Sequence, residues 1–168
     1  MSFLIDPYRY TAEPITDCTG YKDSSDTPGG GLIRCCKVTA SSDYSVAALG
    51  LNSITASDNV QLKMALYSDN SDVPDVLLGQ TAYQYNVTGI HYYDLLSDVS
   101  VTNGTSYWVA LIHLPDTGTF EIKGESTAIS TAQTYAAECV GQTFCSPFGT
   151  PLGSATFGFQ FCMNNGIT

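Results

Sequence analysis

The chain has 168 residues, which suffices for one domain whose core buries about 70% of the surface of the unfolded chain. Its 43% of hydrophobic residues excludes a disordered protein, while its 13% of charged residues is about half the usual share. The formal net charge of −10 disfavours direct binding to a nucleic acid and favours solubility. No apolar stretch approaches the roughly 20 residues of a membrane span, so we expect no membrane partner either.

The first 43 residues contain many breaks of regular structure. Pro7, Pro14, Pro28 and a run of glycines directly after Pro28 interrupt any long helix or strand. We therefore predict an extended N-terminal arm with a cysteine-bearing loop region over residues 1–43. The opening MSFLIDPYRY has no basic start and is not typical of a secretory signal, so we expect either a protein outside signal-directed export or a missing leader.

Residues 44–168 carry the strand patterns. In Val60–Tyr67 the apolar side chains alternate with polar ones, which predicts a strand with one dry face. Tyr107–Leu114 is apolar on both faces, a pattern typical of a strand in the middle of a packed sandwich. About seven strands are predicted, over Ser45–Ala56, Val60–Tyr67, Leu77–Tyr85, His91–Leu96, Tyr107–Leu114, Thr119–Lys123 and Thr156–Met163. Their short spacing predicts an all-β fold, a jelly-roll-like antiparallel β-sandwich.

The cysteines lie on both sides of this strand-rich body, and none falls between residues 37 and 138. The disulfide candidates are Cys18, Cys35, Cys36, Cys139, Cys145 and Cys162. Cys139 and Cys145 are close enough in sequence to close a local loop. They belong to the C-terminal segment 126–168, whose STAISTAQTYAAE stretch fits a strand, a loop or a short helix. Cys35 and Cys36 point to opposite faces of an extended chain and would need separate partners. Buried free thiols are the alternative for two or more of the six, and zinc is disfavoured because no C-x-x-C pair occurs.

Two stretches of the body carry a resemblance to a known family. VQLKMALYSDNSDVPDVLLGQT and VSVTNGTSYWVALI resemble the choice-of-anchor-type β-sandwich domain of phage structural proteins and bacterial surface proteins. The chain departs from the usual G-x-P-G turn by having Asp72-Val73-Pro74-Asp75, and the resemblance does not explain the cysteine-rich flanks. The opening FLIDPYRY is similar to the first residues of small phage virion proteins. It supplies the candidate partner-contact residues Phe3, Leu4, Ile5, Tyr8, Arg9 and Tyr10.

The resemblance implies a non-enzymatic structural protein on the outer surface of a phage virion. A capsid decoration (cement) subunit is the expected role, with a tail-appendage subunit as its nearest variant. The expected partners are the major capsid protein or tail proteins, together with copies of the chain itself. An acidic surface would complement a basic surface on such a partner. Disulfides would suit the outside of a particle.

We find no motif for catalysis, and we expect neither an enzyme nor a bound cofactor. The sequence contains no G-x-S-x-G, H-E-x-x-H or phosphate-binding glycine loop, and we expect structural roles for His91 and His113. One acidic turn is a weak candidate for calcium, through Asp69, Asn70, Asp72 and Asp75. A solvated turn is the favoured alternative, because Asp and Asn serve turns for their own reasons.

Aromatic side chains are the last candidate for function. Tyr83, Tyr85, Tyr92 and Tyr93 lie on or beside predicted strands, where an exposed row could stack on a glycan or anchor a protein neighbour. Cross-strand packing at the surface of the sandwich is the alternative, and Trp108 is expected in the core. The tyrosine row supports the rival function, a carbohydrate-binding or adhesin module.

Overall fold

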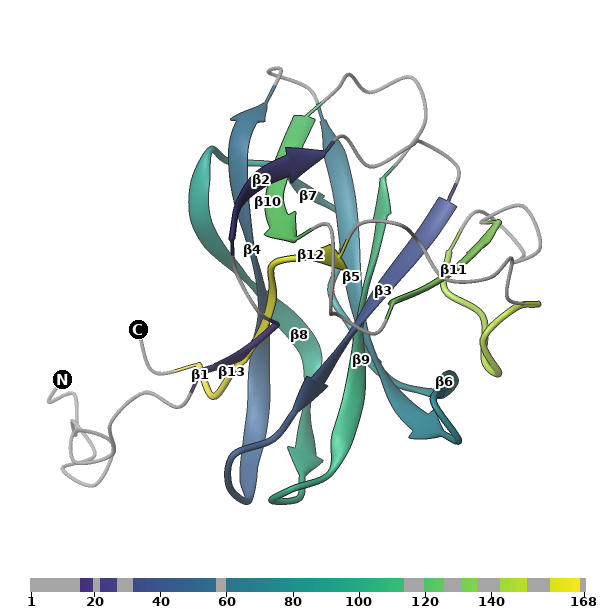
Figure 1. The fold of residues 1–168 in the computed structure, drawn as a ribbon. Helices are drawn as coiled ribbons and strands as arrows, with labels where there is room; N and C mark the ends of the chain where they lie inside the picture. Colours follow the sequence, from purple (N-terminus) through teal and green to yellow (C-terminus); the bar gives the residue numbers. More distant parts are fainter. Residues whose placement is uncertain are drawn as a thin grey trace, which may run out of the picture.

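A computed structural model describes residues 16–19, 22–26, 32–56, 60–113, 120–125, 131–135, 143–150 and 158–166. Within these ranges every element is a β-strand, and the strands form two sheets whose pairings are all antiparallel. The two sheets face one another around a common core (Figure 1). The predicted all-β antiparallel sandwich is confirmed.

The first sheet is organised around its long strand β4. Its seven strands are β1 (Thr16–Cys18), β2 (Lys22–Asp26), β4 (Tyr44–Ala56), β8 (Gly89–Val101), β10 (Phe120–Glu125), β12 (Gly158–Phe159) and β13 (Phe161–Asn164). β8 runs along one side of β4, while β13 and β10 share the other side. Residues 48–51 of β4 pair with both β8 and β13, and Ser53 pairs with both β8 and β10. β8 is therefore an edge strand of this sheet.

The second sheet is organised around β9. Its six strands are β3 (Leu32–Thr39), β5 (Gln61–Asn70), β6 (Val73–Gln80), β7 (Gln84–Tyr85), β9 (Ser106–His113) and β11 (Thr131–Tyr135). β9 pairs with β3 on one side and with β5 on the other, so the strand predicted to lie in the middle does so. β6 and β7 follow one another along the far side of β5 and form an edge.

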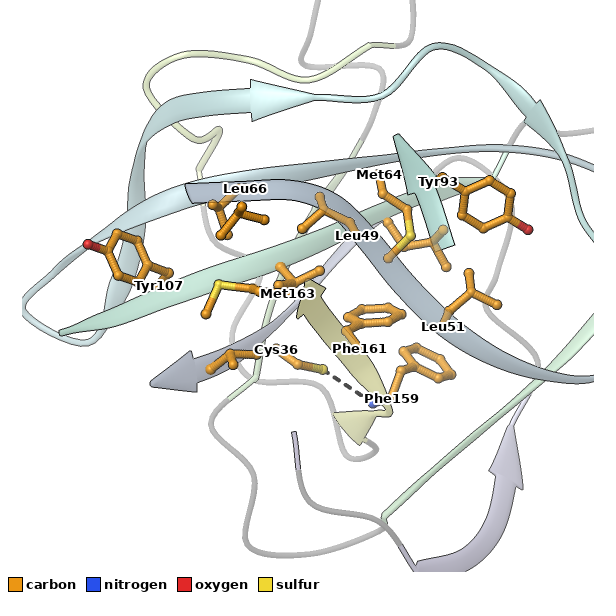
Figure 2. Close-up of a cluster of buried hydrophobic side chains, with 14 of the residues drawn as sticks. Cys36, Leu49, Leu51, Met64, Leu66, Tyr93, Tyr107, Phe159, Phe161 and Met163 are labelled. Carbon is orange, nitrogen blue, oxygen red and sulfur yellow. Dashed lines mark hydrogen bonds between the residues drawn. The ribbon is translucent and has the colours of Figure 1, made fainter. Parts of the chain in front are cut away.

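The main core fills the space between the two sheets. Leu49 and Leu51 of β4 and Phe161 of β13 contribute side chains from the first sheet, and Met64 and Leu66 of β5 contribute from the second (Figure 2). All five are at most 1% exposed. This is the alternation expected of strands that each present one face to a shared interior.

A second, smaller core lies on the outer face of the second sheet. Tyr67 and Trp108 are fully buried there because residues 143–150 run across them with Phe144 and Phe148. The Phe148 ring meets the Tyr67 ring edge to face at 5.3 Å between centroids. This covering segment explains why β9 is apolar on both faces, and it confirms the predicted burial of Trp108.

The strand β3 is the main correction to the predicted organisation. It falls inside the range 1–43 that was expected to form an arm and loops, as do β1 and β2. β3 is an inner strand of its sheet, with Ile33 and Cys35 in the outer core and Cys36 and Val38 in the main core. Burial on both faces removes the alternation that would have marked it in the sequence. The candidate contact residues Phe3, Leu4, Ile5, Tyr8, Arg9 and Tyr10 lie outside the described residues.

One flank of the sandwich is closed by the edges of both sheets. The predicted single strand Leu77–Tyr85 is interrupted at Thr81, which forms an isolated bridge to Leu95 of β8. Around Leu95 the pairing of β8 with β4 shifts register. Gly79 of β6 packs so closely that a Cβ there would lie 2.7 Å from Cγ2 of Val99. β6 and β8 therefore lie side by side, and Asn86, directly after β7, contacts Tyr93 of β8. We call the side of the molecule formed by β6, β7 and β8 the flank.

Candidate functional site

The acidic turn predicted as a weak calcium candidate is the β5–β6 hairpin. Ser71 and Asp72 form its tip with φ values of 54° and 71°, a left-handed geometry that favours glycine or asparagine. Asp69 and Asp72 both bind Nζ of Lys37 on β3, the former at 2.9 Å. Among the described residues no group of three or more acidic, histidine or cysteine side chains converges on a metal position. The turn places its carboxylates around a lysine instead.

Trp108 completes this ion pair. Its Nε1 donates a hydrogen bond of 2.6 Å to Oδ1 of Asp69, and the Lys37 ammonium lies 5.0 Å from the centre of a Trp108 ring. Partial burial alone would raise the pKa of the Asp69 carboxyl, but the hydrogen bonds from Lys37 and Trp108 outweigh it and hold the pKa below its usual range. Burial alone would lower the pKa of Lys37, but its hydrogen bonds to Asp72 and Asp69 outweigh this effect and raise it. These contacts link the tip of the β5–β6 hairpin to β3 and β9 of the same sheet.

The two histidines lie apart from one another. His113 is buried near the end of β9, on the face that carries Tyr107, Val109 and Leu111 into the main core. His91 is exposed on β8, where its ring lies 5.0 Å from that of Tyr93. The described residues therefore contain no histidine pair.

One disulfide closes the first sheet. Cys18 of β1 and Cys162 of β13 are directly opposite in the ladder and are bonded, across a sequence separation of 144 residues. Cys145 is disulfide-bonded as well. The predicted local closure from Cys145 involves Cys139, which lies outside the described residues.

Cys35 and Cys36 are not disulfide partners, so the disulfide expectation is wrong for these two candidates. Both are free and buried, the alternative that was left open for two or more of the six. Because they point to opposite faces of β3, each lies in a different core. Burial raises the pKa of both thiols, that of Cys36 to about 12, although Cys36 Sγ accepts a hydrogen bond of 3.2 Å from the Phe159 amide (Figure 2). Protonated thiols inside a core are not nucleophiles.

The four tyrosines do not form one exposed row. Tyr93 is 4% exposed and belongs to the main core, with its hydroxyl 3.3 Å from Oδ1 of Asn86. The Tyr92 ring packs over Gly50, so closely that a Cβ on Gly50 would meet it at 2.6 Å. Tyr83 and Tyr85 are exposed, and Nζ of Lys63 lies 5.3 Å from the Tyr83 ring. The pair Tyr92–Tyr93, on which glycan binding would depend, is packed against protein.

The flank is the part of the described surface where apolar side chains are exposed. Every large hydrophobic residue that is exposed among the described residues lies between Val73 and Leu96, on β6, β7, β8 or their connections. We call the following six the flank strip: Val76, Leu78, Tyr85, Val87, Ile90 and Leu96. Ile90 and Leu96 are 64% and 67% exposed, more than any other large apolar side chain in the described part of the chain. This concentration of exposed apolar side chains on β6, β7, β8 and their connections makes the flank the candidate interaction surface.

The charged residues of β6, β7 and β8 are all acidic, although Lys63 of the neighbouring β5 lies beside Tyr83 in the β6–β7 connection. Asp75, Asp94 and Asp98 lie on β6 and β8, and Asp94 and Asp98 are exposed. The sequence contains no lysine or arginine between Lys63 and Lys123. An apolar strip with an acidic surround is therefore the feature of the described surface that is best suited to binding.

Comparison with known proteins adds no relative: neither a protein-family model nor a curated protein matches this sequence. Within the described residues there is no helix with the length and apolar character needed to cross a membrane.

Proposed function

We propose that this protein is a non-enzymatic structural subunit on the outer surface of a phage-like virion, a capsid decoration protein that stabilises the particle by contacts with neighbouring subunits. A tail-appendage subunit is the nearest variant. The observation that carries the proposal is the division of the described chain into a filled scaffold and one exposed apolar flank with an acidic surround.

The scaffold is built for rigidity. The two cores bury both faces of β9, and the Cys18–Cys162 disulfide ties the first strand to the last. The titratable groups that the sequence singles out are used within the fold: Asp69 and Asp72 hold Lys37, while the Cys35 and Cys36 thiols are buried. Such a block can carry a binding surface on its outside without disturbing its core.

The charge and the sequence resemblance supply the class of partner. A net charge of −10 keeps free subunits apart and complements a basic surface. The segments that resemble the choice-of-anchor-type domain of phage structural proteins are residues 60–81, which include β5 and β6, and residues 99–112, which span the end of β8 and most of β9. These observations favour a shell or tail protein as the partner over a glycan, because Tyr93 is buried and Tyr92 is packed on Gly50.

The proposal is tested on particles purified from the host that carries the gene. We expect the chain to sediment with the particles in a fixed ratio to the major capsid protein, and particles made without it to release their genome at a lower temperature. Adding the purified chain should restore the heat resistance. A chain that is absent from the particles, or whose loss leaves their heat resistance unchanged, contradicts the decoration role; a few copies per particle support the tail variant.

A further inference from the structure

We propose that the flank strip is the docking surface of this protein, and that it binds a partner protein whose contact surface is apolar at its centre and basic at its rim. This inference rests on the proposed function and names the surface that would carry it. It differs from the expectation drawn from the sequence, which placed the partner contacts in residues 3–10.

On the flank, neighbouring apolar residues differ sharply in exposure. Leu95 is 8% exposed and packs on the flank interior beside Gly79, while the next residue, Leu96, is 67% exposed. On β6, Leu77 joins the outer core while Val76 and Leu78 stay exposed on either side of it. Burying one such leucine in an interface is worth about 1.5–3 kcal/mol. The strip therefore offers several anchors of the kind that form the centre of an interface.

The edge geometry limits how a partner can approach. β8 is an edge strand, but the register shift between Val46 and Ala48 displaces it, and Asp94 and Asp98 flank the shifted segment. Bulges and charges at an edge discourage the addition of a further strand. We infer contact through side chains of the strip, with the carboxylates at its border.

The charge then selects among possible occupants. A second copy would bring Asp94 and Asp98 close to the same carboxylates of its neighbour, and like charges across an interface are repulsive. Nucleic acids and anionic membranes carry the same sign as the flank and are repelled as well. A basic protein surface is the occupant that satisfies both the apolar strip and its border.

A direct test uses the purified full chain and a short amphipathic peptide of leucine and lysine as the probe. We expect the peptide to shift amide NMR signals of β6, β7 and β8, to bind more weakly as salt is added, and to bind better than a leucine–glutamate peptide of the same pattern. Signals shifted elsewhere, equal binding of both peptides, or no binding overturns the proposal. Concentration-dependent dimers that disappear on Leu96→Ser overturn it too, because the occupant would be a second copy.

Substitutions locate the surface. Ile90→Ser and Leu96→Ser should each weaken peptide binding about tenfold. Val73→Ser is the matched control, because Val73 is also exposed but adjoins the tip of the β5–β6 hairpin. Asp94→Asn should reduce the salt dependence, while Glu121→Gln on β10, across β4 from β8, should not. Equal losses for Val73→Ser and Leu96→Ser contradict the assignment.

The same variants separate this inference from the proposed function. If the wild-type chain binds particles and Leu96→Ser does not, both are supported. If both bind particles equally, the function stands and the flank strip is the wrong surface. If neither binds particles while the peptide still binds the flank, the docking surface stands and the virion role is wrong.

Discussion

Two apolar surfaces lie outside the main core, and the chain treats them differently. On the outer face of the second sheet, Tyr67 and Trp108 are covered by Phe144 and Phe148. On the flank, the most prominent apolar side chains, Ile90 and Leu96, are about two-thirds exposed. The first surface is part of the fold, and the second is available to another molecule.

The difference is sharpest on β6, which belongs to both surfaces. The covering segment binds the backbone of β6 twice, through the Phe148 amide to the Asp75 carbonyl at 2.8 Å and through the Leu77 amide to Ser146 Oγ at 3.1 Å. Even so, Val76 and Leu78 remain exposed. Residues 143–150 are bonded to β6, yet they cover Leu77 and leave Val76 and Leu78 exposed. The exposure of Val76 and Leu78 therefore results from the path that residues 143–150 take over β6.

The largest expected effect breaks the covered surface. Phe148→Ala should lower the free energy of unfolding by about 3–4 kcal/mol, because it removes a buried ring and leaves a cavity over Tyr67. Leu96→Ala on the flank should change it by less than about 0.5 kcal/mol. Urea unfolding of the three proteins measures both values. Comparable losses for the two variants would show that the flank is part of the stabilising core.

The sequence predicts the covered surface better than the open one. The double-sided apolar pattern of Tyr107–Leu114 places β9 in the middle of a sheet, and the structure confirms it. β3 is missed because Arg34 and Lys37 interrupt a strand that is buried on both faces and follows a glycine run. Whether an apolar strand residue is covered depends on segments that are distant in sequence, such as residues 143–150 over Tyr67.

The candidate sites show the same limit. The acidic turn was visible in the sequence, but its partner Lys37 lies 32 residues before Asp69 along the chain and meets it only through the pairing of β3, β9 and β5. Tyr92 and Tyr93 are adjacent, yet the pleat sends one to the surface over Gly50 and the other into the core. An alternating strand pattern could have separated this pair, whereas nothing local could have revealed Lys37.

An intermediate effect is expected at Thr81, where the flank joins both sheets. Its hydroxyl accepts a hydrogen bond of 3.0 Å from the Met64 amide and donates one of 2.7 Å to the Ala82 carbonyl. Thr81→Val keeps the shape but removes both bonds in a buried place, which should cost about 1–3 kcal/mol. Amide exchange should then rise on β6 and β8 more than on β9. Thr102→Val, at an exposed site, is the control, and uniform exchange across the molecule would contradict a local role for Thr81.

The smallest expected effect concerns Lys37, at the border of the covered surface. Lys37→Met should lower the free energy of unfolding by about 1 kcal/mol at neutral pH, a value kept small because Asp72 is largely exposed. The folded state lowers the pKa of Asp69, so the stabilisation by the ion pair is complete above the unfolded value of about 3.9 and is lost as the pH falls through the folded value. The pKa of Lys37 is raised, so at the alkaline end the stabilisation is complete below about 10.4 and is lost as the pH rises through the folded value.

Denaturation of the wild type and of Lys37→Met across this pH range isolates the ion pair, because the other titrating groups are common to both proteins. The difference between the two free energies of unfolding should be greatest between these limits and should vanish at both extremes. A difference that stays constant with pH would mean that Lys37 stabilises the hairpin through contacts that do not depend on its charge, such as those of its aliphatic stem. In that case the hairpin would depend on the apolar cover of the second sheet alone, and the acidic turn would be free to act with the flank as part of one acidic surface.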